Sequence, residues 1–183
     1  MAGFKVLGFA GSLRKGSYNR MLLRAAAALS PKGAEVEIFD LEGIPPYNAD
    51  LEADMPLKAR ELKAKVLAAD AILIVTPEYN FSIPGVLKNA IDWASRPNRD
   101  NSFDGKAVAV MGASTGMLGT ARAQYHLRQT FVYLNMYAVN KPEVMIGQAA
   151  QKFDKDGNLT DETAKKLIGQ QLEKLVELAK KLK

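Results

Sequence analysis

The chain has 183 residues, of which 48% are hydrophobic, and this length and composition favour one compact globular domain over residues 1–183. Its formal net charge of +5 favours phosphates and other small anions as ligands, while the spread of acidic residues along the chain argues against a nucleic-acid partner. With no cysteine and a single histidine, the chain excludes disulfides, thiolate nucleophiles and Cys-based metal sites, and a His-dominated metal site is not expected either.

Apolar runs typical of strands alternate along the chain with stretches of helical period. The first run, residues 4–10, is far too short for a signal or transmembrane segment, so we expect a soluble cytoplasmic protein without a membrane partner. In chain order the predicted elements are a strand over 4–10, a helix over 18–29, a strand over 35–40, a helix over 56–69, a strand over 71–76, a helix over 83–95, a strand over 107–113, a helix over 118–133, a weaker strand over 142–147 and a helix over 160–182. This alternation predicts a parallel sheet with helices on both faces. The one long irregular segment, residues 41–56, is predicted to be an extended loop over a functional face.

Three polar loops follow predicted strands. They read GSLRKGSYN after the first strand, PEYNFSIPG after the third and ASTGMLGT after the fourth. Because ligands of such sheets bind beyond the carboxyl ends of the strands, these loops are the expected binding face.

The first loop has the composition of a phosphomonoester pocket. The helix that begins near Tyr18 offers free backbone N–H groups and a partial positive charge to an anion. Ser12, Ser17 and Asn19 add hydroxyl and amide donors, and the Arg14 guanidinium can bind phosphate oxygens in a bidentate way. The loop matches neither GxxxxGKS/T nor GxGxxG, which argues against a Walker-type ATPase and a dinucleotide fingerprint. The alternative is a structural loop in which Ser17 caps the helix.

The second loop suits a planar heteroaromatic ring such as a flavin. Pro77 and Pro84 restrict its backbone, whose amides and carbonyls, with Tyr79 and Asn80, are available to face such a ring. The alternative is a plain strand-to-helix connection with Pro84 near the helix start. In both interpretations one stripe of the following helix packs in the core: Ile83, Val86, Leu87, Ala90, Ile91 and Ala94.

The remaining polar features are interpreted as structural. Asp40 is predicted to be a turn or cap residue, and His126 a surface or interface histidine. The segment DKDGNLTDE, residues 154–162, has the wrong spacing for a calcium loop and predicts a turn and a helix cap. The apolar stripe of the last helix is predicted to pack on the sheet in preference to a membrane surface.

Four motifs of this chain are specific enough to suggest a family: GSLRKGSYN, PEYNFSIPGVLKNAIDW, ARAQYHLRQ and NKPEVM. They resemble the NADPH-dependent FMN reductase family, in particular its bacterial quinone and chromate reductase branch, over about residues 5–147. The resemblance implies a flavodoxin-like three-layer α/β sandwich with a five-stranded parallel sheet of order 2-1-3-4-5. It also implies noncovalently bound FMN, with NADPH or NADH as the hydride donor.

Matched residue by residue, the resemblance implies which side chains bind the cofactor. The implied phosphate ligands are Ser12, Arg14, Ser17 and Asn19. The implied contacts of the isoalloxazine ring are Pro77, Glu78, Tyr79 and Asn80, and the third loop contributes Ser114 and Gly116. In that loop the family often has a Ser-Ser pair where this chain has Ala113-Ser114, which removes one hydroxyl.

The resemblance also implies an assembly and a reaction. Arg122, Tyr125 and Glu143 match positions that join subunits, which implies a homodimer or homotetramer. The implied reaction takes electrons from NAD(P)H through FMN to a quinone or a similar acceptor, such as chromate, another metal ion, an azo or a nitro compound. No side chain is expected to be an obligatory nucleophile or general base, since orientation dominates hydride transfer.

Two alternative functions stay open at this point. One is a flavodoxin-type electron carrier that does not turn over NAD(P)H, and the other is a nucleotide-binding regulatory module. The basic net charge favours the reductase over the carrier, because carriers of this type dock on basic partners and are usually strongly acidic.

Overall fold

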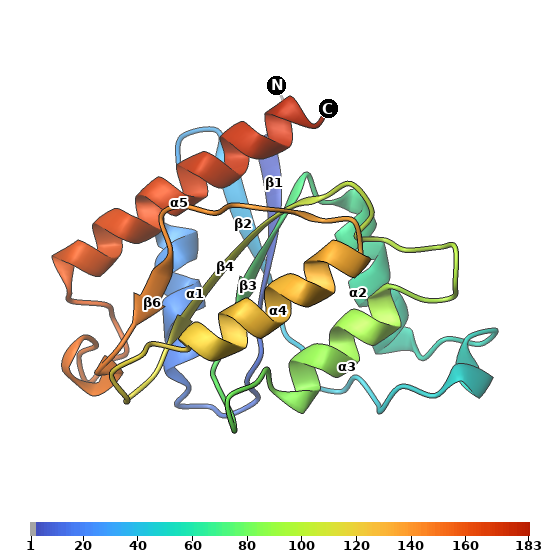
Figure 1. The fold of residues 1–183 in the computed structure, drawn as a ribbon, viewed down its shortest axis with the longest axis horizontal. Helices are drawn as coiled ribbons and strands as arrows, with labels where there is room; N and C mark the ends of the chain where they lie inside the picture. Colours follow the sequence, from blue (N-terminus) through green and yellow to red (C-terminus); the bar gives the residue numbers. More distant parts are fainter. Residues whose placement is uncertain (1–2) are drawn as a thin grey trace.

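The fold is a parallel sheet between two layers of helices, described over residues 3–183 in a computed structural model (Figure 1). In chain order its elements are β1 (Phe4–Ala10), α1 (Tyr18–Ala28), β2 (Ala34–Phe39), α2 (Leu57–Ala68), β3 (Ala71–Val75), α3 (Gly85–Ala94), β4 (Ala107–Ala113), α4 (Ala121–Tyr133), β5 (Tyr137–Ala138), β6 (Val144–Ile146) and α5 (Glu162–Lys181), with short 3-10 turns at Ala49–Leu51 and Ala149–Gln151. The predicted alternation of strands and helices is therefore confirmed.

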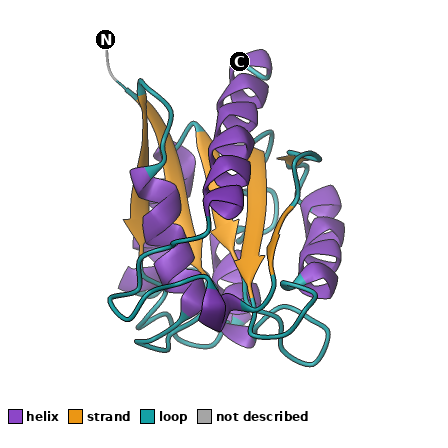
Figure 2. Ribbon diagram, turned by 90° about the vertical axis from the view of Figure 1, so that its left-hand side faces the viewer, coloured by secondary structure: helices purple, strands orange, loops and turns teal. Residues whose placement is uncertain are grey.

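The sheet has the predicted strand order. Its strands run β2-β1-β3-β4-β5, with every pair parallel. Val6 of β1 packs in the core on the side of α1 and α5. Leu7 and Phe9 of the same strand pack in the opposite core, under α2, α3 and α4. Figure 2 shows the strand arrows pointing away from the two chain termini. The loops that follow the strands consequently share one end of the molecule.

The fifth position of the sheet differs from the prediction. The expected strand over 142–147 is shortened to β6, and a second short strand, β5, shares the same edge of β4. β5 pairs with Ala107 and Val108, whereas β6 pairs with residues 111–113, so that the chain leaves the sheet between them. Gln171 of α5 fills this gap by donating hydrogen bonds to the carbonyls of Val110 at 3.2 Å and Pro142 at 2.8 Å. A two-residue strand has no periodicity, which explains why β5 was not predicted.

Helix α4 begins three residues later than predicted. The expected start was residue 118, but Gly119 and Thr120 have φ values of +54° and +71°, which no right-handed helix contains. Gly119 is required there, because a Cβ at this position would lie 2.4 Å from the carbonyl carbon of Met145. The packing of this loop against β6 therefore delays the helix, and nothing local in the sequence reveals that.

The long segment 41–56 lies against α3. The carbonyl of Pro45 accepts hydrogen bonds from Asn89 Nδ2 at 2.9 Å and from Trp93 Nε1 at 2.8 Å, and the Tyr47 backbone N–H donates to Asn89 Oδ1 at 2.7 Å. The Tyr47 ring meets the Trp93 ring edge-on, with the centroids 5.1 Å apart. The segment was predicted to cover a functional face, but none of its residues lines the cavity described below.

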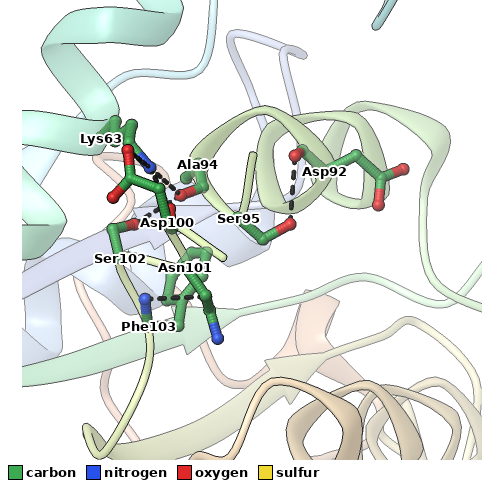
Figure 3. Close-up of polar contacts among 8 residues, drawn as sticks. All are labelled: Lys63, Asp92, Ala94, Ser95, Asp100, Asn101, Ser102 and Phe103. Carbon is green, nitrogen blue, oxygen red and sulfur yellow. Dashed lines mark hydrogen bonds and ion pairs between the residues drawn. The ribbon is translucent and has the colours of Figure 1, made fainter. Parts of the chain in front are cut away.

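A buried lysine fixes the connection between α3 and β4, as Figure 3 shows. Lys63 of α2 is only 9% exposed, and its ammonium group donates to the carbonyls of Ala94 and Asp100 and pairs with the Asp100 carboxylate. The Ser102 hydroxyl donates to the Ala94 carbonyl as well, at 2.6 Å. The end of α3 is thereby joined to residues 100–102 of the loop that leads to β4, through polar contacts that Lys63 completes.

The C-terminal segment has the predicted turn and cap. The Asp154 carboxylate accepts hydrogen bonds from the backbone N–H groups of Asp156 at 2.9 Å and Asn158 at 2.8 Å, and Asp161 caps α5 by accepting from Ala164 N at 2.7 Å. The apolar stripe of α5 is buried in the core, so this helix packs on the sheet. Within residues 3–183, no helix is long and apolar enough to cross a membrane, and no group of three or more acidic or histidine side chains is arranged to hold a metal ion.

Candidate flavin-binding site

A cavity of about 210 Å³ opens where the three polar loops meet at the carboxyl end of the sheet. All the predicted cofactor residues except Asn80 and Gly116 line it, together with three residues that were not predicted. The complete lining is Ser12, Arg14, Ser17, Tyr18, Asn19, Pro77, Glu78, Tyr79, Ala113, Ser114 and Thr115. Tyr18, Ala113 and Thr115 belong to the same loop motifs as the predicted residues. Their position in those motifs was the only sequence signal that they would line the cavity.

The first loop presents free donors. Within the described chain, none of the backbone N–H groups of residues 12–16 donates a hydrogen bond to the protein. Arg14 is exposed, and its guanidinium makes no ion pair with the described acidic residues; its central carbon lies 5.9 Å from the Tyr18 ring centroid. Consecutive unpaired N–H groups beside a free guanidinium form an anion-binding concavity.

Ser17 has the structural role that was considered as the alternative. Its hydroxyl oxygen accepts a hydrogen bond from Asn19 N at 3.2 Å, which makes Ser17 the N-cap of α1. The hydroxyl hydrogen is not consumed by this bond, because a hydroxyl that accepts still has a proton to donate. Capping and ligand binding are therefore compatible at Ser17.

Asn19 is engaged within the protein. Its side chain is buried, with Nδ2 donating to the Ala113 carbonyl at 2.9 Å and Oδ1 accepting from the Ala113 N–H at 2.9 Å. This amide links the start of α1 to the end of β4, and therefore the first loop to the third.

The second loop contains a tight hairpin. Tyr79 and Ser82 exchange two backbone hydrogen bonds of 3.0 and 2.9 Å, and the residues between them, Asn80 and Phe81, have φ values of +50° and +65°. Two consecutive left-handed residues are the conformation of a type I′ turn, in which the second position usually has glycine. A phenylalanine there is strained, and such strain is concentrated at functional sites.

Helix α4 holds this hairpin in place. Glu78 Oε2 accepts hydrogen bonds from the backbone N–H groups of Arg122 at 2.9 Å and Ala123 at 3.1 Å. The Arg122 guanidinium lies 4.0 Å from the centroid of the Phe81 ring, and Ser82 Oγ lies 2.8 Å from Nδ1 of His126. His126 is exposed, as predicted for a surface histidine.

Glu78 acts as the cap of α4 from another loop. The N-cap residue of α4 makes no side-chain capping bond, and the Glu78 carboxylate satisfies two N–H groups of the first turn in its place. Its side chain is only 13% exposed. The carboxylate is therefore committed to the helix terminus at the edge of the cavity.

Bonds to the segment around β6 hold the third loop. Ser114 N donates to the Ile146 carbonyl at 2.9 Å, and the Ser114 carbonyl accepts from Ala149 N at 2.9 Å. Gly116, which lies outside the cavity lining, donates its N–H to Ser114 Oγ at 3.1 Å and accepts from Gln148 N at 2.9 Å. The short strand β6 thus positions the loop that carries Ser114.

The residues predicted to join subunits lie on the surface beside this site. The Tyr125 hydroxyl donates to Glu143 Oε1 at 2.9 Å, and this hydrogen bond to a carboxylate raises the pKa of Tyr125. Arg122 is exposed one turn earlier on α4, next to Glu78.

Elsewhere on the carboxyl end of the sheet, Asp40 has the predicted turn role. Its carboxylate accepts a hydrogen bond from Glu42 N at 3.1 Å and pairs with Arg20 at 2.6 Å.

The family is decided by comparison with known proteins. The model of the NADPH-dependent FMN reductase family matches residues 4–151, which include all three loops of the cavity. The chain belongs to the NADPH-dependent FMN reductase family. The family predicted from the sequence motifs is therefore confirmed, and the fold agrees with it. The cofactors of this family are FMN and NAD(P)H.

Individual members of the NADPH-dependent FMN reductase family and related flavoenzymes are close to this chain. An NAD(P)H-dependent FMN reductase of Pseudomonas aeruginosa is 54% identical over 172 residues, which cover 93% of this chain and 92% of the relative. A quinone reductase of Escherichia coli is 43% identical over 171 residues, covering 91% and 90%. The solved structure of FerB, a flavoenzyme NAD(P)H:(acceptor) oxidoreductase from Paracoccus denitrificans, has a TM-score of 0.88 and 38% identity, with 97% of this chain and 98% of that one covered.

Proposed function

We propose that this chain is an FMN-dependent NAD(P)H oxidoreductase that reduces quinones. When bound, FMN would supply the two-electron redox chemistry that links NAD(P)H to the acceptor. The observation that supports the proposal most directly is the first loop, where the N–H groups of residues 12–16 are free beside Arg14. Unpaired donors of this kind suit a dianionic phosphate, and FMN has one at the end of its ribityl chain.

The phosphate end of the proposed site is built from the first loop and α1. Ser12, Arg14 and Ser17 line the cavity, and the free backbone N–H groups of residues 12–16 belong to the same loop. Ser12 and Ser17 are buried, so their hydroxyls are held in place for a ligand that enters the cavity. Charge-assisted bonds from Arg14 add to affinity and distinguish FMN from riboflavin, which has no phosphate.

The ring end of the proposed site lies between the second and third loops. Pro77, Tyr79, Ser114 and Thr115 line this part of the cavity, and the hairpin and β6 contacts hold both loops rigid. Because hydride transfer depends on alignment of the donor and the ring, a preformed wall is the main contribution that the protein can make.

We assign no acid–base residue to the reaction. The Glu78 carboxylate is engaged by the N-terminus of α4, and His126 lies outside the cavity lining, against Ser82. Tyr79 is available at the wall, where a ring contact explains its presence without proton transfer.

The visible spectrum of the purified protein tests this function. We expect a yellow protein, or an apoprotein that takes up FMN, and bleaching of the flavin band when NADPH is added without oxygen. An electron carrier would bind FMN but stay oxidised with NADPH alone, and a nucleotide-binding regulatory module would bind no flavin. Addition of a quinone to the reduced protein should restore the oxidised spectrum.

Three finer properties belong to the same proposal. Chromate, other metal ions, azo compounds and nitro compounds are proposed as further acceptors, because no specific side chain is assigned to the reduction of the acceptor. Self-association to a homodimer or homotetramer through Arg122, Tyr125 and Glu143 is proposed from their place on one exposed surface. The cytoplasm is proposed as the compartment, and fractionation of cells tests it.

A further inference from the structure

We infer that Asn19 is a positioning residue that joins the phosphate loop to the third loop, and that it is not a ligand of the phosphate. The inference rests on the proposed function, because it concerns the same cavity. It replaces the role that the family resemblance implies for this asparagine.

The geometry of the Asn19 amide supports this role. Oδ1 accepts from the Ala113 N–H and Nδ2 donates to the Ala113 carbonyl, both at 2.9 Å. The residue is 3% exposed. A primary amide that bonds both backbone groups of one residue pairs with it much as a neighbouring strand does.

The end of β3 explains why β4 needs such a partner. On the β3 side of β4, the Met111 carbonyl accepts from Thr76 N at 2.9 Å. Ala113 lies two residues further along and faces the same side, but the pairing of β3 with β4 stops at Val75 and Met111. Asn19 satisfies both of these buried groups, which would otherwise be costly to leave unpaired.

The contacts of Asn19 leave phosphate recognition to its neighbours. Its backbone N–H is bonded to Ser17 Oγ at 3.2 Å, and its side-chain amide to Ala113. Free donors are found instead at the N–H groups of residues 12–16 and at Arg14. Asn19 consequently affects a bound phosphate through the position of the loop.

This role has a consequence that direct ligation does not. Loss of the Asn19 amide separates two loops that flank one cavity, so the phosphate and ring ends of the site are disturbed together. FMN and riboflavin should then lose affinity in parallel. A direct phosphate ligand would matter for FMN alone, because riboflavin has no phosphate.

Titration of the apoprotein with FMN and with riboflavin, followed by quenching of flavin fluorescence, tests the inference. We expect Asn19→Ala to weaken both ligands by roughly tenfold, as loss of two buried hydrogen bonds implies, with the ratio of the two affinities within about threefold of the wild type. Asn140→Ala, an exposed asparagine bonded to Arg128 at 3.2 Å, is the matched control and should change neither affinity. Weakened FMN with unchanged riboflavin would overturn the inference.

A second measurement does not depend on flavin binding. In Asn19→Leu, which keeps the branched shape of the side chain and removes both bonds, the Ala113 amide should exchange with solvent at least about tenfold faster, while the amide of Val108 keeps its wild-type rate. Unchanged protection of Ala113 would contradict the inference. If the wild type bound neither flavin, the proposed function would fail, and this exchange rate would still report whether Asn19 ties the two loops. A purely structural contribution to folding would change stability and leave the affinities of the folded protein unaltered.

Discussion

Glu78 caps α4, a helix that begins 43 residues further along the chain: its Oε2 lies 2.9 Å from the backbone nitrogen of Arg122. The contact places a carboxylate at the positive end of α4 and fixes the second loop of the cavity against that helix. It also gives Glu78 a structural role at a position where an acid–base catalyst would be sought.

Substitution of Glu78 separates these two roles. Glu78→Gln keeps an acceptor oxygen but loses the charge, and we expect it to lower the free energy of unfolding by about 1 kcal/mol. Once saturated with FMN, the variant should keep flavin reduction by NADPH within about tenfold of the wild type, in contrast to the roughly 10²–10⁴ loss for an essential acid or base. Urea unfolding and anaerobic stopped-flow bleaching measure the two quantities. A thousandfold slower reduction would assign Glu78 to proton transfer.

Arg14→Ala should weaken FMN and leave riboflavin nearly unchanged. Loss of one charge-assisted bond costs about 1.5–3 kcal/mol, which corresponds to roughly ten- to a hundredfold in FMN affinity. Arg24→Ala, an exposed arginine of the following helix α1 that lies outside the cavity lining, serves as the control. Equal losses for the two flavins by fluorescence titration would show that Arg14 does not contact the phosphate.

At Phe81, glycine should be better tolerated than alanine. The residue has a φ of +65°, which glycine adopts without strain, whereas alanine keeps the strain and loses the contact with Arg122. We expect the free energy of unfolding of Phe81→Gly, measured by urea denaturation, to be about 1 kcal/mol larger than that of Phe81→Ala. The reverse order would mean that the left-handed turn is absent in solution.

The cap of α5 should make stability depend on pH. Hydrogen bonds from Ala164 N and Lys152 to the Asp161 carboxylate lower the pKa of Asp161 in the folded protein. Because the folded pKa lies below that of the unfolded chain, this contribution is present above about pH 4 and is lost as the pH falls through the folded pKa. Asp161→Ala should therefore lose about 1 kcal/mol at pH 7, and the difference from the wild type should shrink in acid. A difference that stays constant from pH 7 to about pH 2 would contradict this account.

The assembly prediction concerns Arg122. Light scattering should show a wild-type dimer or tetramer, and Arg122→Ala should reduce its mass, whereas substitution of the exposed Arg99 in the loop after α3 should not. Since Arg122 also contacts Phe81 and Glu78, the variant should be checked for FMN binding in the same samples. A wild-type monomer, or an unchanged assembly in the variant, would refute the proposed interface.

The sequence was sufficient for the main features of the fold and for most of the cavity. Strand β1 and strand β4 were predicted with their observed bounds, because buried strands between two helical layers are nearly continuously apolar. The loop residues of the cavity could be predicted because the carboxyl ends of parallel strands meet at one edge.

The contacts that organise the site could not be predicted in this way. The Asn19 amide bonds a backbone that is 94 residues away, and the Glu78 carboxylate caps a helix through residue 122, which is 44 residues away. Neither pairing has a local pattern, so each side chain resembled a ligand when only its own loop was considered. The start of α4 was missed for a related reason, since Gly119 is required by Met145 across the sheet edge.

The divided fifth strand has a consequence for solubility. A long, continuous edge strand exposes a row of unpaired backbone groups on which another chain can polymerise. Here that edge consists of β5 and β6, which contribute two and three residues, and the chain between them turns out of the sheet where Gln171 occupies the gap. An incoming strand would therefore find no continuous ladder to extend, and the protein should resist edge-to-edge aggregation along this side.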